Sequence, residues 1–455
     1  MLLLKNGLVV TGDGKTVYPQ GNVLVDDSGD ILSVGEQLDA AVEEYAQVVD
    51  CAGKAILPGM INHHQHGVTF GPIFASGMKN YGRERIIELL DRNLLQGHTT
   101  VMNVDGFVTM DEVKETQRCH PMRIKTATTH LPINFQAALE CDGKGLNEVH
   151  RNMTAEQMIA DGAVCIGEVG GGHTLGGGGQ DYLYIPKAVK ERKGVDVDYL
   201  QARAMKLAVL GRYIEKSYYD RERVAQALRE NDLDSIMTPE ECRDIVWQTT
   251  YASVQLALEG YEEAAREAIR LDVPLMCHNA PTSKKKVREI AQMGVKKFIA
   301  CHSNYLFTRD EAIENGHFLK DHYGVILDAA VHDPFGNKRL VATAENLFAF
   351  YQNDLVDILS TDFANGGCDS MLKAMEEGVG RHLVSLPKAI SQGTTRVTEA
   401  LPRIAPRLGL LAKGYIADIL VVEYPQLSQV DRIYIGGRLV AQQGRVVDRT
   451  APSRW

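Results

Sequence analysis

The 455-residue sequence lacks the features that would place it in a membrane, outside the cell or on a nucleic acid. No run of about 18 apolar residues occurs, so we expect no membrane-spanning helix. Its first residues, Met1-Leu2-Leu3-Leu4, carry neither the basic region nor the cleavage site of a signal peptide. The longest basic run is Lys284-Lys285-Lys286 and the net charge is −10, which argues against nucleic acid as a partner.

Paired cysteines are also missing. The eight cysteines are scattered without a CxxC pair, and Cys165, Cys277 and Cys301 lie within apolar runs. Such cysteines are typical of buried, reduced core positions. We therefore expect a cytoplasmic protein.

Short apolar runs separated by glycine and aspartate turns occupy both ends of the sequence. Gly7-Leu8-Val9-Val10 and Asn22-Val23-Leu24-Val25 illustrate the first 57 residues, and Asp431-Arg432-Ile433-Tyr434-Ile435 illustrates the last 45. Strands of about five residues with such turns are typical of small β-domains. We therefore predict one β-sandwich domain composed of residues 1–57 and 411–455.

Between these ends, β-like runs alternate with segments of helical periodicity, which is the pattern of a parallel α/β fold. Eight candidate strands can be recognised, and eight suit a closed (β/α)8 TIM barrel over residues 58–410. An open doubly wound sheet is less favoured, because no GxGxxG turn follows the first strand. The candidate strands are Ala55–His66, Thr99–Val104, Arg123–Thr129, Val164–Val169, Val273–His278, Lys297–His302, Gly324–Val331 and Val356–Asp362.

An insertion over residues 170–240 interrupts this alternation after the fourth candidate strand. It begins with the glycine-rich run 170–179, and helical patterns follow from Asp196 to Lys216 and from Thr238 to Arg270. Glycine-rich chain has many accessible backbone states. At the C-terminal mouth of a barrel such a run would serve as an active-site lid, and a flexible surface linker is the alternative.

The strongest local motif is Pro58-Gly59-Met60-Ile61-Asn62-His63-His64-Gln65-His66. Residues two apart on a strand project from the same face, so His64 and His66 can bind one metal ion together. His63 points the other way, towards packing or towards the surroundings of the ligands. Histidine pairs on strands can also lie on a solvent-exposed face, so this motif alone decides little.

Four further ligand-type residues end apolar runs elsewhere in the sequence. Glu168, His278, His302 and Asp362 each lie at or near the C-terminal end of a candidate strand. Barrel enzymes place their catalytic residues at that end, and buried charges are costly unless they are paired or bound to metal. Together with the HxH motif, these residues predict a metal centre.

The chemistry of these side chains suggests a division of roles. Two cations a few ångströms apart need a bridging anion, and Glu168 can offer one oxygen to each. The HxH pair would bind the more buried ion, and His278 and His302 the outer one. Asp362 would bind an ion and take a proton from a metal-bound water, whose pKa the metal lowers. Zinc suits these histidine and carboxylate ligands first, with iron or manganese as alternatives.

These motifs resemble the amidohydrolase superfamily. The likeness rests on Pro-Gly-x-Ile-x-x-His-x-His at residues 58–66, on the two later histidines and on the aspartate of the eighth strand. Two C-terminal segments, Leu408–Val422 and Val430–Val440, resemble the closing strands of that superfamily. The resemblance implies a barrel with a composite β-sandwich. It also implies a metal-dependent hydrolase of C–N bonds in a small-molecule substrate, assembled as a dimer or tetramer.

Two departures narrow the resemblance. Many members have an aspartate where Asn62 stands, although that position is not a usual ligand. Many binuclear members bridge their ions with a carboxylated lysine, where this sequence has Glu168. The Gly167-Glu168-Val169-Gly170 segment resembles enamidases, which open a cyclic enamide by hydrolysing its C–N bond. The insertion that follows is a departure from the enamidases. The resemblance therefore does not imply that this protein acts on the enamidase substrate.

Three further histidines are candidates for substrate binding. His130 follows the third candidate strand, His332 follows the seventh, and His173 lies in the glycine-rich run. Each could orient a carbonyl or carboxylate group of a substrate, and a hydrogen-bonded structural role is the alternative.

Three rival functions stay open. Mononuclear deaminases of this superfamily carry a glutamate just after the fifth-strand histidine, where this sequence has Asn279-Ala280-Pro281. A mononuclear N-acetyl deacetylase also uses a glutamate and two histidines, but the intact pair His64 and His66 favours two ions. A non-catalytic barrel acting as a binding protein would need neither Glu168 nor Asp362.

Overall fold

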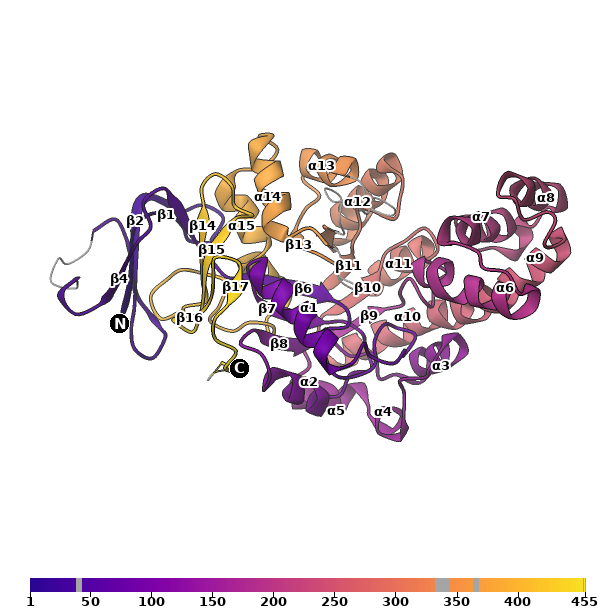
Figure 1. Cartoon of the computed structure of the whole chain (residues 1–455), viewed down its shortest axis with the longest axis horizontal. Coiled ribbons are helices and arrows are strands. Elements are labelled where there is room, and N and C mark those ends of the chain that lie inside the picture. Colours follow the sequence, from indigo (N-terminus) through magenta and orange to yellow (C-terminus); the bar gives the residue numbers. More distant parts are fainter. Residues whose placement is uncertain (38–42, 332–343, 363–367, 453, 455) are drawn as a thin grey trace.

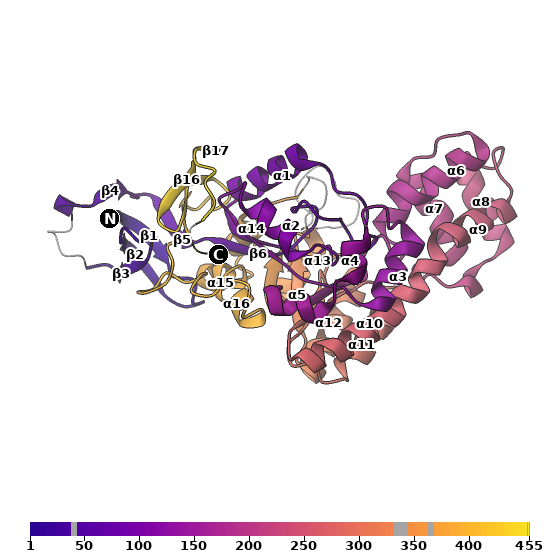
Figure 2. The ribbon, with the colours of Figure 1, turned by 90° about the horizontal axis from the view of Figure 1, so that it is seen from below.

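The computed structural model describes residues 1–37, 43–331, 344–362, 368–452 and 454. In Figure 1 a sheet built from the chain ends lies at one end of the molecule, the parallel strands lie in the middle, and a group of helices projects at the other end. The quarter-turned view of Figure 2 preserves this order. No described helix combines the length and the hydropathy that a bilayer span requires.

Both ends of the chain contribute to one nine-stranded sheet. It contains β1 (Leu2–Val10), β2 (Val17–Val25), β3 (Ile31–Gly35), β4 (Gln47–Asp50), β5 (Lys54–Pro58), β14 (Ile419–Glu423), β15 (Val430–Ile435), β16 (Arg438–Gln442) and β17 (Arg445–Val446). Their order is β17-β16-β15-β14-β5-β1-β2-β3, with β4 beside β1. The antiparallel pair β5 and β14 joins the two ends, with Leu57 opposite Leu420. Val23, Ile56 and Ile419 are buried together in the core of this sheet.

Each of the eight candidates contains a strand of the middle section that runs parallel to its hydrogen-bonded neighbours. They are β6 (Met60–Gln65), β7 (His98–Asn103), β8 (Arg123–Thr126), β9 (Ile166–Val169), β10 (Leu275–His278), β11 (Phe298–Cys301), β12 (Ile326–Ala330) and β13 (Ile358–Ser360). The first candidate, Ala55–His66, is wrong as a single strand, because the chain leaves the terminal sheet at Gly59 and enters β6. A side chain at Gly59 would collide with Thr99, so this crossing requires glycine.

The eight strands form two parallel sheets, β6-β7-β8 and β13-β12-β11-β10-β9, which meet along two seams. At one seam Thr128 pairs with Ile166, and the Gly167 N–H donates to the Thr128 carbonyl at 3.0 Å. At the other, the Asn62 side chain donates to Thr361 Oγ1 at 2.7 Å and accepts from the Thr361 N–H at 3.3 Å. Among the described residues no backbone pairing joins β6 to β13, so side chains hold this seam of the expected barrel.

Helices follow the parallel strands along the chain, as the alternating pattern predicted. They are α1 (Arg83–Leu95), α2 (Met110–Gln117), α3 (Pro132–Cys141), α4 (Glu148–Asn152), α5 (Ala155–Asp161), α10 (Ala252–Leu271), α11 (Lys284–Ala291), α12 (Arg309–Tyr323), α13 (Ala344–Gln352), α14 (Met371–Gly380), α15 (Leu386–Gln392) and α16 (Thr395–Ala400). In α1 the buried residues Ile86, Leu90 and Leu94 recur at helical spacing, so one face packs on the strands. Thr308 and Glu311 form a capping box that begins α12.

The insertion is a helical unit with its own hydrophobic core, in which Val189, Met205 and Val224 are buried. It contains α6 (Ile185–Lys193), α7 (Tyr199–Leu210), α8 (Arg221–Glu230) and α9 (Pro239–Val246), with the short helices Gln180–Tyr184 before them, Lys216–Tyr218 between α7 and α8, and Trp247–Tyr251 after them. Asp198 and Thr238 form capping boxes at α7 and α9, which explains why helical patterns begin there. Neither α6 nor α8 was predicted from the sequence. Figure 2 shows the unit at the end of the molecule opposite the terminal sheet.

Candidate metal centre

The ends of five parallel strands converge on one buried cluster. His64 lies in β6, Glu168 lies in β9, and His278 ends β10, while His302 follows β11 and Asp362 follows β13. None of these residues is more than 8% exposed. Because parallel strands end at one edge of their sheet, residues far apart in the sequence meet here. The six predicted ligands, His66 included, therefore lie together.

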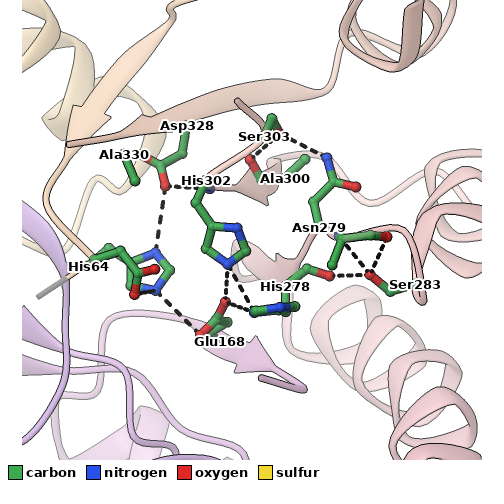
Figure 3. Close-up of polar contacts among 12 residues, drawn as sticks. His64, Glu168, His278, Asn279, Ser283, Ala300, His302, Ser303, Asp328 and Ala330 are labelled. Atoms are coloured by element: carbon green, nitrogen blue, oxygen red, sulfur yellow. Dashed lines mark hydrogen bonds and ion pairs between the residues drawn. The ribbon is translucent and has the colours of Figure 1, made fainter. Parts of the chain in front are cut away.

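Glu168 lies between two groups of histidines, and Figure 3 shows three of these rings around it. Its Oε1 atom is 2.9 Å from His278 Nδ1 and 2.9 Å from His302 Nε2. Its Oε2 atom is 3.3 Å from His64 Nε2 and 3.5 Å from His66 Nε2. One carboxylate thus presents a separate oxygen to each pair of ring nitrogens.

Asp362 places a second carboxylate beside the pair formed by His64 and His66. Its Oδ1 atom is 3.4 Å from both His64 Nε2 and His66 Nε2, while His278 Nδ1 and His302 Nε2 lie 2.9 Å apart. Two ligand atoms that share an ion at about 2.0–2.2 Å lie about 3.0–3.5 Å from each other in common geometries. Two groups of three residues each offer potential ligand atoms that lie within 4.8 Å of one another. One group is His64, His66 and Asp362, and the other is Glu168, His278 and His302. The spacing therefore suits one divalent ion in each group.

The charges in the cluster favour cations. Burial opposes ionisation of Glu168, but His64 and His278 hold the pKa of this carboxyl well below its ordinary value. Burial likewise opposes ionisation of Asp362, and His64 and His66 nevertheless lower its pKa. The carboxylates outweigh burial in turn at His64 and raise its pKa to about 10. Buried His64 Nε2 has no hydrogen-bond partner among the described residues, which also fits a metal ligand.

Asp105 was not singled out by the sequence analysis, and it holds His66. Its Oδ1 atom is 2.8 Å from His66 Nδ1 and accepts a hydrogen bond from the Phe74 N–H at 2.7 Å, while Oδ2 accepts one from the Gly67 N–H at 2.9 Å. A carboxylate behind a histidine ligand fixes the ring and leaves the other nitrogen for the metal. Asp105 follows the candidate strand Thr99–Val104, so the strand-end rule could have found it.

Asp328 is a second carboxylate that the sequence analysis missed. It is fully buried in β12, 3.2 Å from His63 Nε2 and 3.6 Å from His64 Nδ1. Burial opposes its ionisation, but His63 and His64 hold the pKa of Asp328 far below its ordinary value. His63 therefore belongs to the surroundings of the ligands, one of the two roles expected for it. The available signal was a charge within the apolar run Ile326–Ala330.

Tyr305 and Cys301 also adjoin the cluster. The Tyr305 hydroxyl donates a hydrogen bond to Asp362 Oδ2, and no sequence pattern marked this tyrosine. Cys301 is buried with a free thiol, as expected, but its Sγ atom also lies within 4.8 Å of ligand atoms of His64 and Glu168. Burial raises the pKa of this thiol well above its ordinary value. Cys301 is therefore a neutral neighbour in the absence of a bound ion.

His173, predicted to bind substrate, is connected to the cluster through an aromatic ring. Phe74 stacks on His173 at a centroid distance of 4.2 Å and packs on His66 at 5.3 Å. His173 Nδ1 lies 3.1 Å from Ser76 Oγ and 3.0 Å from the Tyr184 hydroxyl. Burial lowers the pKa of His173 to about 3, so the ring is neutral.

His130 and His332 are the other two histidines that were predicted to bind substrate. His130 is buried, with Nδ1 3.0 Å from Thr128 Oγ1 and its ring edge-on to Phe107. Burial lowers its pKa to about 4. These contacts fit the alternative of a structural histidine, but the buried Nε2 atom has no hydrogen-bond partner among the described residues, so substrate binding by His130 stays a prediction. His332 lies outside the described residues.

The glycine-rich run 170–179 is packed into the protein, and most of its residues are buried. Lys206 of α7 donates to the Gly177 carbonyl at 3.2 Å and forms a buried ion pair with Asp181, with 2.5 Å between Nζ and Oδ1. The helical insertion therefore holds this run in place. A flexible surface linker does not describe it, and its role as a lid stays a prediction.

The chain is similar to known proteins both in sequence and in fold. Residues 55–440 match the sequence model of the amidohydrolase family. The chain is 22% identical to adenine deaminase 1 of Carboxydothermus hydrogenoformans over 98% of its own length, and it spans 59% of that relative. Its structure is similar to β-aspartyl dipeptidase of Fervidobacterium islandicum, with a TM-score of 0.58, 13% identity and 98% of each chain covered. It is also similar to a zinc-bound adenosine deaminase from Xanthomonas campestris, with a TM-score of 0.53, 16% identity and 98% and 94% covered.

Proposed function

We propose that this chain, which belongs to the amidohydrolase family, hydrolyses a C–N bond of a small molecule with the help of two divalent metal ions. The observation that carries the proposal is the position of Glu168. Each of its oxygens faces a different pair of histidine nitrogens, at 2.9 to 3.5 Å. In a mononuclear site, one of these two histidine pairs would bind no metal ion.

The ligands divide into two sets that share Glu168. His64, His66 and Asp362 would hold one ion, and His278 and His302 would hold the other. Zinc fits these nitrogen and oxygen donors, and so do iron and manganese. When bound, such ions would supply an acidified water and polarise the carbonyl of the scissile bond. They would also offset the charge of the buried carboxylates.

Asp362 is the proposed proton carrier. Its lowered pKa keeps the carboxylate ionised and able to accept a proton at Oδ1, which faces the first histidine pair. The hydrogen bond from Tyr305 to Oδ2 fixes the carboxylate and directs the other oxygen into the site. A proton held at Oδ1 can then pass to the leaving nitrogen, which makes that nitrogen a neutral leaving group.

Two substrate classes suit this chemistry. The Gly167-Glu168-Val169-Gly170 segment and the carboxylate bridge favour a cyclic amide or enamide, whose ring the reaction would open. The likeness to an adenine deaminase along 98% of the chain favours a second candidate, an amino-substituted heterocycle that would lose ammonia. A ring-opened acid and free ammonia are different products, so the two candidates can be separated directly.

Family membership also supports structural proposals that the described residues leave open. We propose that residues 58–410 close into a (β/α)8 barrel, with residues 1–57 and 411–455 as a composite β-sandwich domain. Assembly as a homodimer or tetramer would be tested by light scattering on the purified protein.

Metal content is the first test. Elemental analysis of protein purified without chelator should find about two equivalents of metal per chain. One equivalent would favour a mononuclear deaminase or deacetylase, and none would favour a non-catalytic binding protein. With two found, panels of cyclic amides, enamides and amino-heterocycles should be screened for carboxylate and for ammonia. The control is Glu168→Gln, which keeps the shape of the side chain and removes its charge.

A further inference from the structure

Asp328 contacts both groups of candidate ligands. Its carboxylate is fully buried in β12 and lies between β6 on one side and β11 on the other. Towards β6, Oδ2 is 3.6 Å from His64 Nδ1, and Oδ1 is 3.2 Å from His63 Nε2. The first distance is an ion-pair contact rather than a hydrogen bond. It still favours a proton on His64 Nδ1 and leaves Nε2 free to face Glu168.

Towards β11, the same carboxylate holds the backbone of His302. The His302 N–H donates to Asp328 Oδ2 at 2.9 Å, as drawn in Figure 3. Just beyond, the Ser303 N–H donates to the Asp328 carbonyl at 2.8 Å. His302 has a φ of +35°, a backbone conformation that side-chain-bearing residues rarely adopt. Such a conformation persists only where neighbouring contacts fix it, and Asp328 provides two of them.

We propose that Asp328 is a positioning residue for both ions: it orients His64 in the first ligand set and fixes the turn that carries His302 in the second. The inference rests on the proposed metal centre and names a residue outside the six ligands. Asp105 offers a matched contrast, because it contacts the ring of His66 and so serves the first set alone. Removing either carboxylate should weaken metal binding, but in different patterns.

The experiment measures the affinities of the two metal equivalents by competition with a chromophoric chelator, with Zn²⁺ added to metal-free protein. Asp328→Ala removes both acceptor oxygens and should weaken both equivalents by about 10- to 100-fold each. Asp328→Asn keeps one oxygen for the His302 N–H, so the equivalent held by His64 should weaken more than the other. Asp105→Asn should weaken one equivalent only, and that equivalent identifies the set of His64 and His66.

Each outcome decides the inference. If the Asp328 variants bind two equivalents with wild-type affinity, or lose the same single equivalent as Asp105→Asn, Asp328 does not position both sets. If the wild-type chain binds no Zn²⁺, the proposed function fails as well, so the two failures are distinguishable. Melting curves of the metal-free proteins check folding. If Asp328→Ala is recovered unfolded, the pattern in Asp328→Asn decides.

Discussion

The parallel-strand core and the helical insertion both bury charged side chains, but they neutralise them in different ways. In the insertion, Lys206 and Asp181 are nearly inaccessible and form an ion pair with 2.5 Å between Nζ and Oδ1. In the core, the carboxylates of Glu168, Asp328 and Asp362 are surrounded by histidines. The first arrangement pairs a carboxylate with fixed positive charges, since Arg203 also contacts Asp181 at 3.1 Å, and the second places carboxylates against histidines.

The two regions differ in how the positive charge beside a buried carboxylate arises. A lysine carries its own positive charge, so the pair of Lys206 and Asp181 needs nothing further from solution. Histidines become cations only by taking up protons, and a neutral imidazole is also a metal ligand. A buried group of carboxylates and histidines is therefore completed by protons or by metal ions. The same physical rule predicts that the insertion serves as a support and the core cluster as a reactive site.

The strongest test of this contrast removes the charge at the centre of the core cluster. Glu168→Ala should abolish metal uptake at both sites and lower kcat/KM by at least about 1,000-fold, since the carboxylate that gives one oxygen to each ligand set is lost. The melting temperature of the metal-free variant should stay near that of the metal-free wild type. Retained binding of two equivalents would contradict the bridging role.

Asp362→Asn should separate proton transfer from ligand binding. The amide oxygen can still face the first histidine pair, but the side chain can no longer accept a proton. We expect kcat to fall by about 100- to 10,000-fold while KM changes little. Elemental analysis should still find metal, and near-normal turnover in this variant would exclude Asp362 as the proton carrier.

Lys206→Met should have the opposite pattern. The substitution removes the buried cation from Asp181, which keeps its ion pair with the partly exposed Arg203 at 3.1 Å, and should cost up to about 3–5 kcal/mol of stability. Denaturant unfolding and hydrogen exchange over α6–α9 should detect the loss, while metal stoichiometry stays that of the wild type. The double variant Lys206→Met/Asp181→Asn is the control, and it should recover part of the stability. Loss of metal in the single variant would show that the two regions are coupled.

The smallest effect is expected at the edge of the insertion. Arg212 and Tyr213 contact Glu311 of α12, and both side chains are substantially exposed. Ion pairs of this kind contribute up to about 1 kcal/mol. Arg212→Ala should therefore shift the free energy of unfolding by no more than that, and turnover should stay unchanged. A large loss of activity would mean that this contact controls the position of the insertion.

Much of the core could be predicted from the sequence because its physics is local. Short apolar runs predicted all eight parallel strands, and ligand-type residues at their ends predicted a cluster whose members then proved to be neighbours. Parallel strands end at one edge, so Glu168 and Asp362 could be placed together without any knowledge of long-range contacts. Their roles in metal binding and proton transfer stay predictions.

The remaining features depend on contacts between distant segments. Asp328 lies inside a strand rather than at its end, and only the arrangement of β6 and β11 around it shows what it holds. The break at Gly59 follows from its approach to Thr99, which no periodicity reports. Tyr305 lies in a turn without a recognisable pattern. The helices α6 and α8 pack on the core of the insertion, and the N-cap Asp220 of α8 and the αL Gly194 that ends α6 are signals that the sequence offered.

The seam between β6 and β13 has a consequence for how the protein matures. Asn62 and Thr361, 299 positions apart, hold this seam with side-chain hydrogen bonds. His64 and His66 stand on one side of it and Asp362 on the other. An ion shared by these three residues would hold the same seam, so metal binding would add to the stability of the folded chain. The cellular metal supply would then determine how much newly made chain survives proteolysis, as well as how much of it is active.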